Sequence, residues 1–376
     1  NLIGLTFEKT SFKTIDLEEL SLLYNTKKMT SLGLSDVTME SADYFAKEFF
    51  QTGIKETLRY LSFKDSPRIQ WTLNLQTLLS KLDYITVLSL ENCNIEISEL
   101  LITLHDFKYD NLKVLNLSGN KAQHMSMSGF ELPVNLQCIV LNDITWNENT
   151  LRNIMRRILE HPFIRKLSVT NAIVNEEEWR SIARLFKKSK LTQLKSLIWN
   201  NNPVTEALMD FVGNNKDLQF LSLCGIFNSY QSKIAALLVR YLYKKPLLKR
   251  LIIRGSVTNY LGKLTHTIVK AALGCPQLEN LDISGNMIND KCAVQLQKVY
   301  TTKSALRTFN FEGTGVNFFV SLKETLRLAA ISENIRTNIP FKDINRFIDN
   351  EQINQKEADE IVNTFRKKPN IEGKML

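Results

Sequence analysis

The hydrophobic residues of this chain recur in a nine-residue frame, with large apolar side chains at positions one, four and six and asparagine at position nine. The frame is clearest in residues 112–120 (LKVLNLSGN), 194–202 (LKSLIWNNN) and 278–286 (LENLDISGN). Apolar positions four and six flank a variable position five, which is the two-residue period of a strand with one buried side. Each copy of the frame therefore predicts a short strand.

The fourth position of the frame serves as a ruler, because it returns every 24 to 30 residues along most of the chain. Weaker copies keep the apolar positions and lose only the asparagine. A phase held for this long is the signature of leucine-rich repeats. The sequence thus predicts twelve repeats, with these ruler residues: Leu5, Leu32, Leu61, Leu88, Leu115, Ile139, Leu167, Leu197, Leu221, Leu251, Leu281 and Phe309.

Amphipathic segments lie between the frames, and the clearest is residues 176–188. Acidic residues open this segment and lysines close it, as the helix dipole favours, and Asn175 is well placed to cap its first turn. One helical face carries its apolar residues, which are Trp179, Ile182, Leu185 and Phe186. The pattern predicts a helix in this repeat, and a similar stripe predicts one in the next: Ala207, Leu208, Phe211 and Val212.

Packing distances predict how these elements are layered. Neighbouring strands lie about 4.8 Å apart, whereas packed helices need about 8–10 Å. The strands must therefore line the inner side of a curve and the helices its outer side. The predicted fold class is α/β, a curved leucine-rich repeat solenoid of the ribonuclease-inhibitor-like horseshoe type. Its parallel sheet forms the concave face and its helices form the convex face.

The asparagine at position nine bonds backbone groups that a tightly turning chain leaves unpaired. We expect Asn120, Asn202 and Asn286 to form such a structural ladder. Thr10, Ser66, Cys93 and Thr314 are polar substitutes at the same position in other repeats. Ile144 and Ala172 cannot substitute, so local irregularity is expected around them.

Two domains are expected. Residues 1–318 form the solenoid, in which the first repeat is truncated, and residues 319–376 form a helical cap that closes the last repeat. An apolar stripe in the cap supports its helical character: Ala358, Ile361, Val362 and Phe365. The chain begins inside a repeat, at Asn1, and this start predicts that it is a piece of a longer protein.

Composition favours a reduced, cytoplasmic protein with protein partners. Five cysteines lie far apart without a C-x-x-C pair, unlike the disulfide-rich caps of extracellular repeat proteins. The net charge is +9. Two interpretations stay open for the bunched basic residues: solvated helix ends and turns, or attraction to an anionic membrane surface or an acidic partner. The three groups are Lys187, Lys188, Lys190 and Lys195; Lys244, Lys245, Lys249, Arg250 and Arg254; and Arg366, Lys367 and Lys368.

The sequence offers no catalytic pattern. None of the four histidines stands beside a nucleophile motif or at metal-ligand spacing, and His105 and His161 are interpreted as surface or half-buried residues. Phosphate-binding glycine loops are absent, and the run Glu176–Glu178 is interpreted as a helix start. We therefore expect no enzyme activity, no cofactor and no metal. Nucleic acid is a poor fit, because no recognition motif accompanies the positive charge.

The outward side chains of the predicted strands are the best candidates for binding a partner. Six of them are large or charged: Tyr60, Val87, Val114, Phe220, Arg250 and Arg254. Phe220, Arg250 and Arg254 lie in adjacent repeats and could form an anchor, since aromatic residues and arginine dominate binding hot spots. The alternative is that all six are ordinary exposed strand residues.

Two short segments near the end of the chain, residues 306–308 (LRT) and 335–343 (IRTNIPFKD), resemble parts of the leucine-rich region of the CARMIL family, whose name denotes a linker of capping protein, an actin nucleator and myosin I. In that family a final repeat opening Leu-Arg-Thr precedes a helix and a segment of the form L-R-x-x-P-I-P-x-x-D. Residues 306–308 (LRT) and 335–343 (IRTNIPFKD) are similar to these pieces. The resemblance implies a cytoplasmic scaffold at the actin-rich cell cortex. It places lipid-binding, dimerising and capping-protein-binding regions outside this chain.

The leading hypothesis is a non-catalytic protein-interaction scaffold linked to actin regulation, similar to the CARMIL leucine-rich region. Membrane contact would then be indirect, through regions beyond this chain, and a homodimer stays open. Two alternatives remain. One is a ribonuclease-inhibitor-type module that clamps a protein target, and the other is a structural subunit or effector in a larger assembly.

Overall fold

The computed structural model describes residues 3–49, 53–67, 76–123, 130–227, 232–256, 259–261, 264–286 and 308–310. The chain divides into two compact units, Asn1–Leu194 (unit 1) and Lys195–Leu376 (unit 2). The predicted cap at residues 319–376 and the predicted boundary at 318 lie outside the described ranges, so the two-domain division stays a prediction.

Unit 1 contains a parallel sheet whose strands follow one another in chain order. The ruler residues pair directly across it, from Leu5 with Leu32 through to Ile139 with Leu167. Two short parallel pairs lie beside it, β2 (Ser11–Phe12) with β4 (Thr38–Met39) and β8 (Lys121–Ala122) with β10 (Thr145–Trp146). The strands of the main sheet are β1 (Gly4–Glu8), β3 (Ser31–Ser35), β5 (Tyr60–Lys64), β6 (Val87–Glu91), β7 (Val114–Asn116), β9 (Cys138–Asn142) and β11 (Lys166–Thr170).

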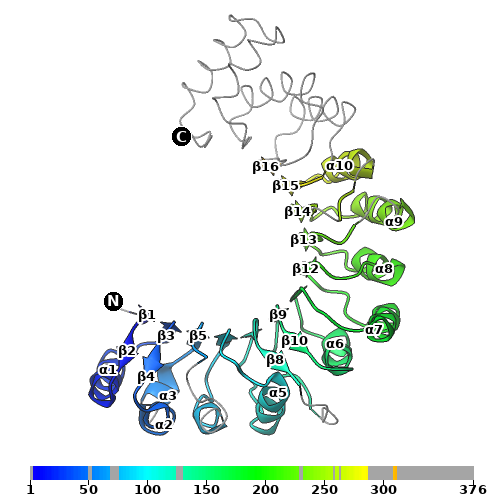
Figure 1. Cartoon of the computed structure of the whole chain (residues 1–376). Helices are drawn as coiled ribbons and strands as arrows, with labels where there is room; N and C mark the ends of the chain where they lie inside the picture. Colours follow the sequence, from blue (N-terminus) through cyan, green and yellow to red (C-terminus); the bar gives the residue numbers. More distant parts are fainter. Residues whose placement is uncertain are drawn as a thin grey trace, which may run out of the picture. The chain divides into compact units, whose positions relative to one another are not determined.

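The helices of unit 1 lie on one side of this sheet (Figure 1). The predicted helix over 176–188 is present, and the Asn175 carboxamide oxygen accepts a hydrogen bond from the backbone N–H of Glu178 at 2.8 Å. Ile182 and Phe186 are buried on its inner face. The helices are α1 (Thr14–Lys27), α2 (Ala42–Tyr44) leading into a π-helix (Phe45–Phe49), α3 (Ile54–Thr57), α5 (Ile97–Asp106), α6 (Thr150–Glu160) and α7 (Glu176–Lys188).

Unit 2 repeats the same arrangement. Its ruler residues are also in register, with Leu197, Leu221, Leu251, Leu281 and Phe309 paired in turn. Its strands are β12 (Ser196–Asn200), β13 (Phe220–Ser222), β14 (Arg250–Ile252), β15 (Asn280–Asp282) and β16 (Thr308–Asn310). Helices α8 (Glu206–Asn214), α9 (Ser232–Leu242) and α10 (Thr265–Leu273) lie on one side of them (Figure 1). Both units thus have the α/β leucine-rich repeat fold that the frame predicts.

The residue at position eight of the frame turns the chain out of each strand with a positive φ. In the repeats that the structure describes there, ten of eleven have this conformation, and position eight of the other is Gly255. The residues are Lys9, Asp36, Asp65, Asn92, Gly119, Asp143, Asn171, Asn201, Gly225 and Gly285. Asn, Asp and Gly tolerate left-handed backbone best, which explains why the frame ends in pairs such as Gly-Asn and Asn-Asn.

This turn survives where position nine is apolar. The φ of Asp143 is 55° and that of Asn171 is 53°, like those of the other repeats. Strands β9 and β11, which lead into these two turns, pair with each other over their full length. Ile144 and Ala172 are buried. The predicted irregularity around them is therefore wrong, because their side chains join the core while the left-handed residue before each one makes the turn.

Candidate protein-binding surface

Residues that flank the ruler residues project away from the core of each unit. In unit 1, Tyr60, Val87 and Val114 occupy paired positions of three successive strands. Tyr60 is 39% exposed and the two valines are half-buried. These three predicted site residues therefore form one row on the side of the unit 1 sheet that faces away from the helices. We call this side of the sheet, in either unit, the strand face.

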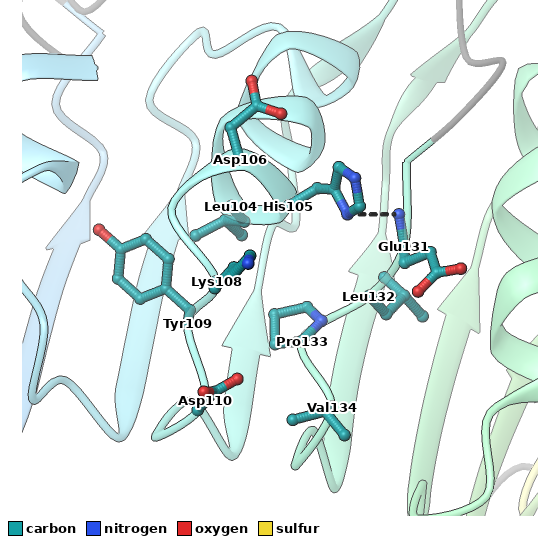
Figure 2. A pocket seen from close by; sticks show the side chains of 10 residues that line it. All are labelled: Leu104, His105, Asp106, Lys108, Tyr109, Asp110, Glu131, Leu132, Pro133 and Val134. Carbon is teal, nitrogen blue, oxygen red and sulfur yellow. Dashed lines mark hydrogen bonds between the residues drawn. The ribbon is translucent and has the colours of Figure 1, made fainter.

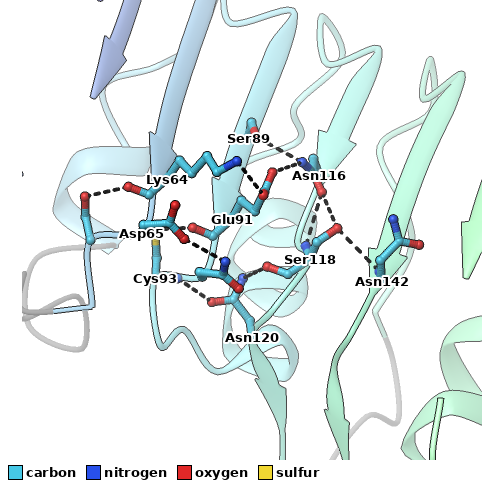
Figure 3. Close-up of polar contacts among 11 residues, drawn as sticks. Lys64, Asp65, Ser89, Glu91, Cys93, Asn116, Ser118, Asn120 and Asn142 are labelled. Carbon is cyan, nitrogen blue, oxygen red and sulfur yellow. Dashed lines mark hydrogen bonds and ion pairs between the residues drawn. The ribbon is translucent and has the colours of Figure 1, made fainter. Parts of the chain in front are cut away.

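A chain of polar contacts crosses the strand face of unit 1 (Figure 3). The Lys64 amine and the Glu91 carboxylate form an ion pair at 3.2 Å. The Asn116 amide donates to Glu91 and to the Ser89 hydroxyl at 3.3 and 3.2 Å. The Ser118 hydroxyl donates to the Asn116 carboxamide oxygen at 2.7 Å. We call this linked set, Lys64, Ser89, Glu91, Asn116 and Ser118, the polar chain of unit 1.

The polar chain extends into the next two repeats. The backbone N–H of Asn142 donates to the Ser118 hydroxyl at 3.4 Å, and the Ser168 hydroxyl donates to the Asn142 carboxamide oxygen at 2.8 Å. These contacts join side chains of β5, β6, β7, β9 and β11 to one another. The strand face of unit 1 is consequently organised before any partner arrives.

In unit 2, Arg250 and Phe220 lie on adjacent paired strands. The guanidinium carbon of Arg250 is 4.9 Å from the centre of the Phe220 ring, which is a cation–π contact. Arg250 is exposed and Phe220 is half-buried. The structure thus brings together two of the three residues of the predicted anchor.

The third residue of the predicted anchor, Arg254, is engaged elsewhere. It comes four residues after Arg250, beyond the end of β14. Its Nε donates to the Asp282 carboxylate at 2.7 Å, and the two side chains are 55% and 12% exposed. The Ser284 hydroxyl also donates to Asp282, at 2.7 Å. The positive charge of Arg254 is therefore balanced by Asp282 within unit 2.

The ladder asparagines are buried inside the turns. The Asn120 carboxamide oxygen accepts from the N–H groups of Cys93 and Ile95 at 3.1 and 3.0 Å, and its amide donates to Leu90, Leu117 and Ser118 carbonyls. Asn286 accepts from Leu261 N–H at 2.9 Å and donates to the carbonyls of Ile253 and Ile283. Asn202 is buried as well. The contacts of Asn120 and Asn286 thus link successive turns of the backbone.

A second buried polar row was not predicted. Its members lie six residues before a ruler residue, and each reaches a backbone carbonyl near the end of a helix or in a neighbouring turn. Lys245 is the most elaborate: its amine donates to the carbonyls of Val212, Gly213 and Asn215 at 2.6, 3.1 and 2.5 Å. We call this set the buried capping row, and it consists of Tyr109, His161, Asn215, Lys245 and Cys275.

The capping row corrects two interpretations of the sequence. Lys245 is only 2% exposed and burial lowers its pKa to about 8, so it does not belong to a basic surface group. His161 is buried rather than superficial. One ring nitrogen accepts from Phe163 N–H and the other contacts the Pro133 carbonyl at 3.1 Å, which fixes a neutral tautomer. Burial lowers the pKa of His161, although the bond to Pro133 opposes this shift.

A hollow of about 380 Å³ lies in unit 1 between the turn after α5 and the segment before β9 (Figure 2). Asp106, Asp110 and Glu131 contribute carboxylates to its lining, together with Lys108. The His105 ring accepts from the Glu131 N–H at 3.3 Å. The residues that line the hollow include no serine, threonine or cysteine that could pair with this histidine as a nucleophile.

Among the residues that the structure describes, no three histidine, cysteine or acidic side chains gather to hold a metal ion. Burial raises the pKa of the Cys93 thiol to about 12, which disfavours the reactive thiolate. The cysteines described, Cys93, Cys138, Cys224 and Cys275, are free. Over the same ranges, no helix has the length and apolar character needed to cross a bilayer.

Comparison with known proteins adds little beyond the fold. No protein-family model matches the chain, and no curated protein matches its sequence. Solved structures do match. One is the crystal structure of an internalin (inlF) from Listeria monocytogenes, which is 14% identical with a TM-score of 0.44, over 85% of this chain and 84% of that chain. Neither value is high enough for this likeness to bear on function, so function is argued from the repeat surface itself.

Proposed function

We propose that this chain is a non-catalytic protein-interaction scaffold that binds its partner through the strand face, with Phe220 and Arg250 as the anchor in unit 2. The contact between these two side chains is the observation that carries the proposal. An arginine stacked on an aromatic ring loses little further freedom when it binds, and both residue types are enriched in hot spots.

The repeat architecture supports this assignment. Leucine-rich repeats hold outward side chains at regular intervals along paired strands, which suits recognition of an extended protein surface. The polar chain of unit 1 and the Arg254–Asp282 pair add rigidity, because their side chains are held by neighbouring repeats. A preorganised surface reduces the entropy that binding must overcome.

The class of partner that we propose is actin-regulatory, and the setting is the cytoplasm or cell cortex. Support for this finer statement comes from the resemblance of residues 306–308 and 335–343 to the CARMIL leucine-rich region. Most of those residues lie outside the described ranges. Contact with membrane would be made by regions beyond this chain.

The test is affinity capture from a cytoskeletal extract with the whole chain as bait. Three baits are compared: the unchanged chain, Arg250→Glu, and Arg240→Glu as a control with the same charge change. Arg240 is exposed on α9, the helix between β13 and β14, and therefore lies on the helix side of unit 2. We expect actin-regulatory proteins to be recovered by the unchanged and control baits and lost with Arg250→Glu.

Two outcomes would count against parts of this proposal. Equal capture by all three baits would show that the Phe220–Arg250 pair is not the anchor. Recovery of no actin-associated protein by the unchanged chain would contradict the proposed link to actin.

A further inference from the structure

Exposed cations gather where the strands of unit 2 begin. They lie on the first residues of the strands or in the turns that lead into them, at Lys195, Lys216, Lys244, Lys249 and Arg250. Acidic residues in the same turns are fewer, with Asp217 and Glu279 present. Within the described part of unit 2, none of the five cations forms an ion pair. We call these five residues the basic edge.

Arg250 is the member of the basic edge that is best prepared to bind. Its guanidinium carbon lies over the Phe220 ring, and the group makes no hydrogen bond to any residue whose placement the structure describes. A guanidinium carries five N–H donors in a fixed fork that matches a carboxylate. The exposed N–H donors of Arg250 are therefore available to bind a carboxylate of a partner.

Arg254 provides an internal reference for this interpretation. It lies on the same repeat as Arg250 and carries the same charge, but Asp282 of the next repeat accepts its Nε–H at 2.7 Å. The position next to Arg250 in the following strand is Asn280, which cannot neutralise it. Among the described residues of unit 2, an acid therefore pairs with Arg254 and none pairs with Arg250.

We infer that the basic edge of unit 2 recognises an acidic protein segment, one of whose Asp or Glu carboxylates pairs with Arg250 while others face the surrounding lysines. This inference rests on the proposed scaffold function and names the chemistry of its partner. Neighbouring strands are about 4.8 Å apart, so Lys195 and Lys249, which are two strands apart, lie roughly 10 Å from each other at the backbone. An extended peptide spans that distance in about three residues.

The local charges favour a peptide over an anionic membrane or a nucleic acid. Asp217 and Glu279 interrupt the basic edge, whereas binding to an anionic bilayer uses uninterrupted clusters of Lys and Arg. A peptide can place its carboxylates between those acids. Single-stranded nucleic acid needs free aromatic platforms for its bases, and the Phe220 ring is already occupied by Arg250.

The experiment measures binding of the whole chain to a short fluorescent peptide in which Glu alternates with Ser. Anisotropy gives the Kd for the unchanged chain, Arg250→Glu, Arg250→Lys and the matched control Arg240→Glu. We expect Arg250→Glu to weaken binding at least about tenfold, Arg250→Lys by several-fold because the fork is lost, and Arg240→Glu by less than about twofold. Circular dichroism and thermal melting establish that each variant is folded.

Parallel arms identify the alternatives. Equal losses for Arg250→Glu and Arg240→Glu would overturn the inference, since overall charge would then explain binding. So would Arg250-dependent binding to phosphatidylserine vesicles or to single-stranded RNA without binding to the peptide. If capture of a protein partner depends on Arg250 while the acidic peptide does not bind, this inference fails and the proposed function stands.

Discussion

The strand faces of the two units differ in how they use charge. In unit 1, Lys64 is paired with Glu91, and Glu91 is bonded to Asn116, so the charges of this part of the sheet are balanced by neighbouring strands. In unit 2, Asp282 balances Arg254, but Arg250 lies over the Phe220 ring and pairs with no acid among the described residues. Exposure alone is therefore not enough to identify a binding residue. A side chain whose bonding capacity is already used inside the molecule has little to offer a partner.

The two units share an ordered backbone but differ in which side chains are available to bind a partner. Both units hold their turns with buried asparagines, so both strand faces rest on an ordered backbone. The difference lies in the outer layer of side chains, where the polar chain of unit 1 is bonded internally, whereas Arg250 of unit 2 pairs with no acid among the described residues.

The largest effect is expected from removing a ladder asparagine. Asn120→Ala would leave two N–H groups and three carbonyls of neighbouring turns without their partner, and we expect the free energy of unfolding to fall by roughly 4 kcal/mol. Asn286→Ala removes one acceptor bond and two donor bonds, so roughly 3 kcal/mol is expected. Denaturant unfolding measures both.

An exposed asparagine provides the control for this prediction. Asn135 donates one hydrogen bond to the Asp110 carbonyl at 2.7 Å in a surface turn, and Asn135→Ala should cost less than about 1 kcal/mol. If Asn120→Ala were no more harmful than Asn135→Ala, the ladder would not be what supports the strand face of unit 1.

The next largest effect concerns Lys245, which belongs to the buried capping row of unit 2. In unit 1 the members of this row are Tyr109 and His161, neither of which is a lysine. Burial lowers the pKa of Lys245 to about 8, from an unfolded value near 10.5. Between these values the unfolded chain holds a proton that the folded chain has released. The free energy of unfolding therefore gains about 2 kcal/mol from this group between pH 8 and pH 10.

Lys245→Met isolates this contribution, because it removes the titrating group and keeps a long apolar side chain. Unfolding of the two proteins in urea at pH 8, 9 and 10 should show the unchanged chain gaining stability relative to the variant. A constant difference across the three pH values would mean that the Lys245 amine keeps its ordinary pKa in the folded chain.

The strands could be predicted from sequence because one constraint fixes them all. A slip of one residue would turn every buried leucine outward, so the ruler from Leu5 to Phe309 predicts the pairing directly. The left-handed turns could also have been predicted, since Asp36, Asn92 and Gly119 share position eight and are the residue types that tolerate positive φ.

The capping row and the free arginine could not be predicted in the same way. Tyr109, His161 and Lys245 have no common chemistry, and only their shared distance from the ruler unites them. Lys245 was grouped with surface cations because the sequence does not reveal that its amine reaches the end of α8. Likewise, the adjacency of Phe220 and Arg250 follows from the frame, but the pairing of Arg254 with Asp282 depends on side-chain geometry across two repeats.

The smallest predicted effect alters the charge balance itself. Asp282→Asn would release Arg254 while its carboxamide oxygen can still accept from Ser284. Loss of the Asp282 negative charge beside Arg254 should raise affinity for the Glu-Ser peptide by about two- to threefold, a modest gain because Arg254 is half exposed and screened by solvent. Anisotropy titrations at low salt measure the change.

Glu91→Gln makes the equivalent change in unit 1, where it releases Lys64 and shifts the net charge by the same amount. Lys64 has no aromatic ring to orient it and, as an ammonium, cannot form a bidentate pair with a carboxylate. We therefore expect this variant to bind the peptide as the unchanged chain does, within about 1.5-fold. Equal gains for the two variants would show that the peptide responds to total charge, and the distinction between the balanced face and the open one would then have no consequence for binding.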